Sequence, residues 1–277
     1  MNIQTALEQG TRILADAAVS APRLTAEVLL SHAIGCDRTW LYAHSTDELK
    51  ELWWIHYGRY LNERLNGKPT QYITKKQEFY GREFAVSPDV LIPRPETEHV
   101  VEAALERLGG IDGLIVDAGT GSGAIAITLA LESGRRAIGT DISAAAVGVA
   151  EKNRVALNAA AVSFVACDLI SAVADHSVAV LASNPPYVPE TDKTVLQKEV
   201  RDFEPEVALY GGGDGLQIYQ RLIADARRVL IPGGWIIMEV AYNSDVAVRA
   251  MLQATFTDVE MRSDLAGLPR VVLAKLL

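Results

Sequence analysis

From Gly113 onward, short apolar runs alternate with segments of helical period, and this pattern constrains the fold more than any other feature of the chain. The runs "LIVDAG", "AIGTD", "VSFVACD", "VAVLASN" and "GWIIMEVA" have the length of buried strands, and segments such as "GAIAITLALES" between them have that of helices. Such alternation predicts a mostly parallel sheet covered by helices. The last two runs, "DVEMRSD" and "RVVLAKLL", are separated only by "LAGLP". A link this short is too short for a parallel crossover, so we expect these two strands to pair antiparallel.

The N-terminal part of the chain lacks this alternation and is predicted to be helical. "APRLTAEVLLSHAIG" has helical apolar spacing. "STDE" at 45–48 has the pattern of a capping box and is expected to open a long helix. Gly67 and Pro69 are expected to end that helix. We therefore expect a helical domain over 1–69.

A change of period marks the link between the two parts. "QYITKKQEFYGREFAV", 71–86, has strand period and predicts a β-hairpin. "SPDVLIPRPETE" follows as a rigid loop that leads into a helix from about Thr97 to Leu108. We expect residues 70–95 to form the hairpin and linker, and 96–277 the sheet domain.

Composition excludes several classes of partner. The net charge is −9 and basic residues occur at most in pairs, which disfavours a nucleic-acid partner. The N-terminus does not have the pattern of a signal peptide, and no run is long and apolar enough to span a membrane. Cys36 and Cys167 lie far apart, so we expect both to be reduced and buried in a cytoplasmic protein. We expect the protein to be a monomer. No metal is expected, because the histidines match neither a ligand spacing nor a triad: His32, His44, His56, His99 and His176.

A glycine-rich turn follows the first strand of the sheet domain. In "VDAGTGSGA", 116–124, glycines at 119, 121 and 123 allow the backbone to approach a ligand closely. Asp141, at the end of the second strand, suits a pair of ribose hydroxyls. The spacing also fits the relaxed dinucleotide fingerprint, and a tight turn with a helix cap remains the purely structural alternative.

The third and fourth strands also end in polar residues. Asp168 in "ACDL" could accept a hydrogen bond from the exocyclic amine of adenine, with Leu169 against the ring, or it could cap a helix at Ser171. Asn184 ends the fourth strand. Four consecutive strands thus present polar groups at one edge, where ligands of open α/β sheets bind.

"DAGTGSGAIAI", "TDIS", "CDL" and "NPPY", in this order, resemble the class I methyltransferases that use S-adenosylmethionine. The resemblance implies a Rossmann-like seven-stranded sheet whose last strands are antiparallel. It also implies that Asp141 holds the ribose, that Asp168 and Leu169 hold the adenine, and that Asn184 lies beside the cofactor. The methionine part would be held by Gly119, Thr120, Gly121, Ser122 and Gly123.

The Asn-Pro-Pro-Tyr motif is shared by enzymes that methylate a planar amine or amide nitrogen, and the chemistry explains its residue types. An amide nitrogen is a poor nucleophile because its lone pair is delocalised. Asn184 Oδ1 and the Pro185 carbonyl are expected to accept its two N–H hydrogens and so direct the lone pair. Pro185 and Pro186 make the loop rigid, and Tyr187 is expected to pack on the planar group. Adenine, cytosine and glutamine all offer such a nitrogen, so the motif alone does not choose the substrate.

Three further stretches resemble the HemK/PrmC family: "RLTAEVLLSHAIGCDRTWLYAH", "GKPTQYITKKQEFYGREFAVSPDVLIPRPETE" and "FEPEVALYGGGDGLQIYQRL". The resemblance covers nearly the whole chain. It implies methylation of the glutamine in the Gly-Gly-Gln loop of class I peptide-chain release factors, with S-adenosylhomocysteine as the second product. One departure is Lys75, where the family pattern predicts glycine. Arg94 and Glu96 of "PRPETE" are expected to pair and hold the linker.

The motifs leave other functions as alternatives. A relative that methylates a glutamine of a ribosomal protein would typically differ in "IPRPETE". A DNA adenine methyltransferase would need a basic target-reading domain, and a nicotinamide dehydrogenase an acid or base for hydride transfer. A binding module without catalysis is disfavoured by the intact Asn-Pro-Pro-Tyr motif.

Overall fold

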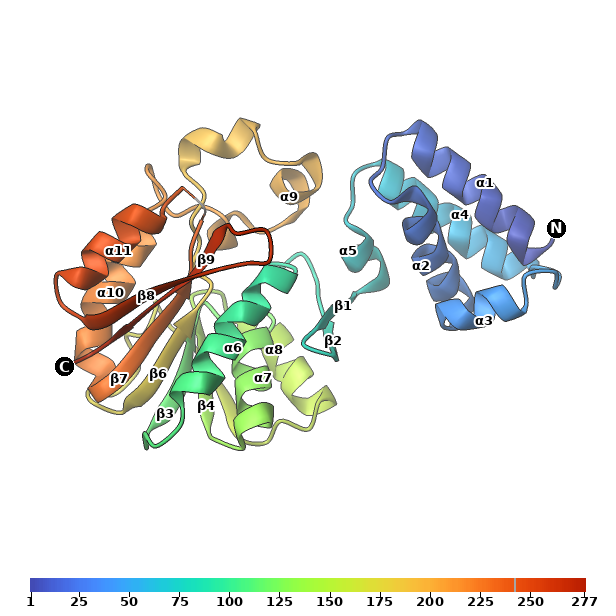
Figure 1. The fold of residues 1–277 in the computed structure, drawn as a ribbon. Helices are drawn as coiled ribbons and strands as arrows, with labels where there is room; N and C mark the ends of the chain where they lie inside the picture. The colour runs from blue at the N-terminus through green and yellow to red at the C-terminus, as the bar shows by residue number, and fades with distance from the viewer. Residues whose placement is uncertain (242) are drawn as a thin grey trace. The chain divides into compact units, whose positions relative to one another are not determined.

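The predicted sheet is present in the computed structural model, which describes residues 1–241 and 243–277 (Figure 1). Its seven strands lie in the order β5-β4-β3-β6-β7-β9-β8. The pairs from β5 to β7 are parallel, and β8 pairs antiparallel with β9, as the sequence predicts. The structure adds that β9 also pairs antiparallel with β7. The strands are β3 (Leu114–Ala118), β4 (Ala137–Asp141), β5 (Val162–Ala166), β6 (Val178–Ser183), β7 (Leu230–Glu239), β8 (Thr257–Ser263) and β9 (Pro269–Lys275).

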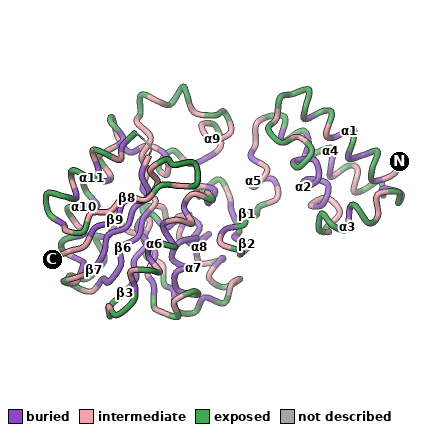
Figure 2. The backbone as a smooth tube through the Cα atoms, in the orientation of Figure 1, coloured by how far each residue is buried: buried purple, intermediate pink, exposed green. Residues whose placement is uncertain are grey.

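Both faces of this sheet are buried, because successive residues of its central strands point into different cores. Trp235 and Ile237 of β7 pack with α6 and α7, whereas Ile236 and Met238 pack with α10 and α11. Apolar side chains on both faces are typical of a parallel sheet covered by helices, and buried backbone is concentrated along these strands (Figure 2). The helices of this part are α6 (Glu98–Arg107), α7 (Ala124–Ser133), α8 (Ala144–Ala156), α10 (Gln217–Val229) and α11 (Asp245–Gln253), with short 3₁₀ turns η1 (Pro95–Thr97), η2 (Glu190–Thr194) and η3 (Glu206–Ala208).

The strand order reverses between β3 and β6, and this topology places the candidate site. After β3 the chain moves outward to β4 and β5, and then returns to β6 on the other side of β3. Ligands of open α/β sheets bind at such a switch point, beyond the carboxyl ends of the strands. The glycine loop after β3 and the Asn-Pro-Pro-Tyr loop after β6 are therefore neighbours.

The chain divides into two units, 1–76 with 197–203 and 77–196 with 204–277. The first unit is helical, with its own core around buried Leu29, Leu30 and Tyr57. No helix in the described part of the chain is long and apolar enough to cross a membrane. The helices of the first unit are α1 (Ile3–Asp16), α2 (Pro22–Ile34), α3 (Arg38–Ala43), α4 (Glu51–Leu65), α5 (Thr70–Thr74) and α9 (Lys198–Phe203).

The sequence did not indicate that α9 belongs with the first unit. Arg64 Nη2 of α4 lies 2.7 Å from Glu199 Oε2 of α9, and this ion pair is mostly buried on the arginine side. Lys198 and Phe203 lie beside Gly67. The segment after the Asn-Pro-Pro-Tyr loop thus enters the first unit before it returns to the sheet domain.

The long helix α4 begins later than the capping-box pattern predicts. It starts at Glu51, so Ser45 and Glu48 are outside it. The backbone from 45 to 49 instead pairs with the N-terminus: Gln4 N–H donates to the Ser45 carbonyl at 2.9 Å, and Asn2 bridges to Glu48. Tertiary pairing of this backbone replaces the predicted cap.

The connector contains the predicted hairpin, but the hairpin is shorter than expected. Its strands are β1 (Lys76–Phe79) and β2 (Arg82–Ala85), and residues 70–74 form the helix α5 instead. Lys75 ends α5 with φ of 62°. That left-handed conformation favours glycine, which explains why a glycine is the expected residue there.

Candidate active site

The loop between β3 and α7 exposes its backbone to a pocket. The N–H groups of Gly119 and Thr120 both donate to the Thr140 carbonyl, each at 2.8 Å. Gly119 and Gly121 have φ of 73° and 54°, and a Cβ added at either would meet no atom within 4 Å. Both glycines therefore face open space, and side chains there would both strain the backbone and fill the pocket.

Asp117 supports this loop from beneath and was not identified from the sequence. It is fully buried, and its Oδ2 accepts hydrogen bonds from the Thr120 hydroxyl at 2.6 Å and from Ala126 N–H at 3.1 Å. Burial raises the pKa of Asp117 to about 7, the two hydrogen bonds oppose this rise, and nearby Asp141 adds to it. An aspartate just before the glycine loop, at an otherwise apolar strand position, was the available clue.

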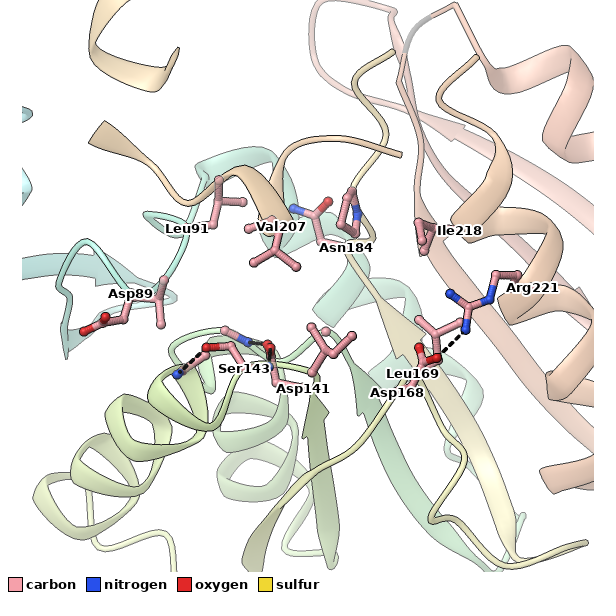
Figure 3. Close-up of a pocket in the computed structure, with 17 residues that line it drawn as sticks. Asp89, Leu91, Asp141, Ser143, Asp168, Leu169, Asn184, Val207, Ile218 and Arg221 are labelled. Atoms are coloured by element: carbon pink, nitrogen blue, oxygen red, sulfur yellow. Dashed lines mark hydrogen bonds and ion pairs between the residues drawn. The ribbon is translucent and has the colours of Figure 1, made fainter. Parts of the chain in front are cut away.

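Asp141 ends β4 and holds both the glycine loop and the start of α8. Its Oδ2 accepts from Gly121 N–H and its Oδ1 from Ser143 N–H, each at 2.9 Å. A carboxylate oxygen has more than one lone pair, so both oxygens can still accept from a ligand. Figure 3 shows Asp141 at the floor of the pocket, with Ser143 beside it.

Asp168 also lines the pocket, together with an arginine that the sequence did not single out. Arg221 Nη2 of α10 lies 2.6 Å from Asp168 Oδ2 (Figure 3). Leu169 follows with φ of 46°, an uncommon backbone conformation for leucine. Residues whose backbone is held in such a conformation cluster at binding sites, and Leu169 lines the pocket.

Asn184 follows β6 and faces the same pocket (Figure 3). Its Nδ2 donates to the Thr97 hydroxyl at 3.0 Å. Pro186 also lines the pocket, and Pro185 is buried. The Tyr187 hydroxyl points to Glu239, 3.4 Å from its Oε1, and burial raises the pKa of Tyr187.

The pocket brings together seven of the predicted residues: Gly119, Gly121, Asp141, Asp168, Leu169, Asn184 and Pro186. The other predicted residues are not among those that line it: Thr120, Ser122, Gly123, Pro185 and Tyr187. The segment 89–91 and the side chains of Val207, Ile218 and Arg221 also line it and were not predicted.

Close backbone packing supports the Asn-Pro-Pro-Tyr loop. Val188 N–H donates to the Leu209 carbonyl at 2.9 Å, and Gly211 N–H donates to the Val188 carbonyl at 3.0 Å. A Cβ added at Gly211 would lie 2.6 Å from the Pro186 carbonyl oxygen. Only glycine therefore allows this approach to the loop.

Arg94 does not form the predicted ion pair with Glu96. Its Nη2 lies 2.5 Å from Glu204 Oε1, whose side chain is almost fully buried. The pair joins the segment before α6 to the segment after α9 within the sheet domain. Arg94 directly precedes η1, and its partner is a carboxylate 110 residues further along the chain.

Comparison with known proteins identifies the family. The model of the PrmC N-terminal domain matches residues 5–74, and that of the methyltransferase small domain matches residues 97–202. The release factor glutamine methyltransferase of Koribacter versatilis (strain Ellin345) is 41% identical over 278 residues, which cover 99% of each chain. The chain belongs to the release factor glutamine methyltransferase family. The family member of Moorella thermoacetica is 40% identical over 279 residues, covering 99% of this chain and 98% of the other.

Solved structures show that this family member has the class I methyltransferase fold. A methyltransferase from Pyrococcus furiosus superposes with a TM-score of 0.55 at 16% identity, covering 74% of this chain and 93% of that one. The 16S rRNA N2 G1207 methyltransferase of Thermus thermophilus, solved with AdoMet and guanosine, superposes with a TM-score of 0.53 at 21% identity. The match covers 73% of this chain and 50% of that one. At these identities the likeness extends to the fold alone.

The pocket of this family member suits a nucleoside with a polar extension. Asp141 offers carboxylate oxygens for a hydroxyl pair, and Leu169 offers an apolar surface beside Asp168. The open space over Gly119 and Gly121 leaves room for a chain that runs along the loop backbone. The residues present thus fit S-adenosylmethionine.

Proposed function

We propose that this chain transfers a methyl group from S-adenosylmethionine to the side-chain amide nitrogen of the glutamine in the Gly-Gly-Gln motif of class I release factors. The observation that carries the proposal is the position of Asn184. It faces the same pocket as Asp141 and Asp168, in a chain about 40% identical from end to end to release factor glutamine methyltransferases.

Different residues of the pocket bind different parts of the methyl donor, S-adenosylmethionine. Asp141 accepts from the ribose hydroxyls, and Asp168 accepts from the adenine amine while Leu169 packs on the ring. The loop from Gly119 to Gly123 holds the methionine part, with Thr120 and Ser122 packed beneath it. When bound, the donor supplies an electrophilic methyl group on a sulfonium.

Asn184 and Pro185 hold the glutamine amide. Asn184 Oδ1 and the Pro185 carbonyl accept its two N–H hydrogens, which sets the direction of the nitrogen lone pair. Positive charge develops on the nitrogen during transfer, so both acceptors bind the transition state more strongly than the ground state. Fixed geometry contributes further, because the two prolines stiffen the loop and Tyr187 narrows the site for a planar group.

The first unit supplies recognition of the protein substrate in this proposal. A glutamine side chain offers little surface for discrimination, so binding energy from remote parts of the substrate has to position it. The first unit matches the PrmC N-terminal domain. We assign to it the grip on the release factor.

Labelling with radioactive S-adenosylmethionine tests the function. The chain is incubated separately with a class I release factor, with ribosomal proteins and with DNA. We expect label only on the release factor, and none when the Gly-Gly-Gln glutamine is replaced by asparagine. Label on ribosomal protein or DNA with an unlabelled release factor would overturn the proposal.

A further inference from the structure

Glu239, at the end of β7, is a buried carboxylate that the proposed function does not use. Its exposed fraction is 2%. Its Oε2 accepts from the Thr97 hydroxyl at 2.6 Å, and its Oε1 lies 3.4 Å from the Tyr187 hydroxyl. A buried carboxylate is costly unless it is well bonded, so its position between two elements of the site has to be explained.

Thr97 connects this carboxylate to Asn184, and the donors and acceptors fit in one arrangement. Asn184 Nδ2 lies 3.0 Å from Thr97 Oγ1 and can only donate. The hydroxyl therefore accepts from Asn184, and its single hydrogen goes to Glu239 Oε2. An ionised carboxylate can accept that hydrogen and cannot donate in return.

This arrangement sets which way the Asn184 amide faces. With Nδ2 held by Thr97, Oδ1 accepts no hydrogen bond from any residue in the described part of the chain. Oδ1 is the atom that has to accept from the substrate amide. If the amide were flipped, the NH2 group of Asn184 would face the NH2 group of glutamine. Two hydrogen-bond donors cannot form a hydrogen bond with each other.

We propose that Thr97 and Glu239 are positioning residues, which hold the Asn184 amide so that Oδ1 stays available to the substrate glutamine. The inference rests on the proposed function, because it assigns these residues a part in that same site. Neither side chain lines the pocket, so both act through Asn184.

The protonation state of Glu239 couples this arrangement to pH. Burial raises the pKa of Glu239 to about 7, and the charge of Glu96 adds to the rise. The hydrogen bond from Thr97, the charge of Arg270 on β9 and the hydrogen bond from Tyr187 oppose it. Tyr219 of α10 donates to the Glu239 backbone carbonyl at 3.0 Å, and burial raises the pKa of both tyrosines.

Protonation of Oε2 reverses the hydrogen-bond directions. The carboxylic acid then donates to Thr97, and the threonine hydrogen needs an acceptor, which the flipped Asn184 amide provides through its oxygen. Acid therefore favours the orientation that cannot bind the substrate amide. We expect turnover to fall as the pH drops through about 7.

The first test compares Thr97→Val with Thr97→Ser in the full chain. Valine keeps the shape but lacks the hydroxyl, and serine keeps the hydroxyl. We expect kcat to fall roughly tenfold in the valine variant, the effect of one lost hydrogen bond, with KM for the release factor little changed. The serine variant should recover most of the loss. Equal kcat in the wild type and the valine variant would overturn the proposal.

The second test is the pH profile of Glu239→Gln. Glutamine can place its oxygen toward Thr97 and its NH2 group toward the Tyr187 hydroxyl, and it does not titrate. The acid limb of kcat near pH 7 should therefore disappear. An acid limb that persists unchanged in this variant would assign the titration to another group and overturn the role of Glu239.

A readout without substrate separates this inference from the proposed function. The side-chain NH2 signal of Asn184 in ¹⁵N NMR is assigned by its absence in Asn184→Ala. It should shift in Thr97→Val and stay near its wild-type position in Thr97→Ser, whatever the substrate is. If the wild type labels no release factor, the proposed function fails alone. If the signal is unmoved in the folded valine variant, the positioning role fails. Should that variant not fold on thermal melting, the Glu239→Gln profile decides.

Discussion

Arg221 reaches from α10 to the end of β5 and places its Nη2 2.6 Å from Oδ2 of Asp168, at the edge of the pocket. Both side chains are about half exposed, at 51%. The arginine occupies one side of the carboxylate and fixes its direction. It therefore orients the group that we assign to the adenine amine, although the pair itself is open to water.

Replacing Arg221 with methionine should weaken binding of S-adenosylhomocysteine only mildly. An exposed ion pair is worth about 0–1 kcal/mol, which corresponds to at most about fivefold in affinity. Asp168→Ala should cost more, about tenfold, because it removes the acceptor itself. Calorimetry measures both. Arg154→Met, which breaks an ion pair with Glu151 on α8, is the matched control and should have no effect. A loss larger for Arg221→Met than for Asp168→Ala would contradict the assignment.

Asp141 should not tolerate replacement by asparagine. Both of its oxygens accept backbone N–H groups, so an asparagine would turn its own NH2 group toward one of these donors. We expect Asp141→Asn to weaken the binding of S-adenosylhomocysteine nearly as much as Asp141→Ala does, by about one to two decades in affinity. Calorimetry on the two folded variants checks this. Near-normal affinity in the asparagine variant would show that only one carboxylate oxygen matters.

Asn184→Ala should reduce turnover without loss of cofactor affinity. The substitution removes one acceptor for the glutamine amide but leaves the glycine loop and Asp141 intact. By analogy with the loss of one oxyanion-hole donor, kcat should fall roughly 10²–10³-fold. Single-turnover methylation of the release factor and calorimetry with S-adenosylhomocysteine separate the two effects. A variant with near-normal turnover would refute the role of this side chain in orienting the substrate.

The sequence predicts the sheet and the convergence of Asp141, Asp168 and Asn184, because parallel strands end at one edge whatever the details of packing. Alternating apolar runs are a local property, and so is the residue that ends each run. The structure brings these three side chains to one pocket, although β5 ends at Ala166 and β6 at Ser183, so Asp168 and Asn184 lie just beyond their strands.

The parts that the sequence does not reveal depend on contacts between distant segments. Thr97, Asn184 and Glu239 are far apart along the chain and meet only because η1, β6 and β7 are neighbours in the fold. Glu239 follows an apolar run that is read as core. The capping pattern at Ser45 fails for the same reason, since the backbone there pairs with the N-terminus.

Gly211→Ala should slow the reaction, although residue 211 does not line the pocket. Its added Cβ would lie 2.6 Å from the backbone oxygens of both Pro186 and Gly215, so the loop that carries Asn184 has to shift. Misplacement of about 1 Å can reduce a rate about 10²-fold, and we expect a fall of at least tenfold in kcat. Gly213→Ala is the matched control, because its Cβ would meet no atom within 4 Å. Equal rates in the two variants would contradict the supporting role of Gly211.

Asp117 should make the stability of the ligand-free protein depend on pH. Its pKa is raised to about 7 by burial, whereas the pKa of an aspartate in the unfolded chain is about 3.9. The folded state therefore holds the proton more tightly, so the stabilising contribution of this group is full below about pH 4. This contribution is lost as the pH rises toward 7. Above that pH, Asp117 no longer makes the stability depend on pH.

Asp117→Asn isolates this contribution, because asparagine does not titrate and its oxygen can still accept from Thr120 and Ala126. The wild type should lose stability relative to the variant by about 1 kcal/mol per pH unit between about pH 5.5 and 7, or roughly 2–4 °C in Tm. Other titrating groups, Glu239 included, are present in both proteins and cancel in the difference. Thermal melts across this range measure it. A difference in Tm that stays constant from about pH 5.5 to about pH 8 would mean that Asp117 is ionised throughout, with its buried charge stabilised by the glycine loop.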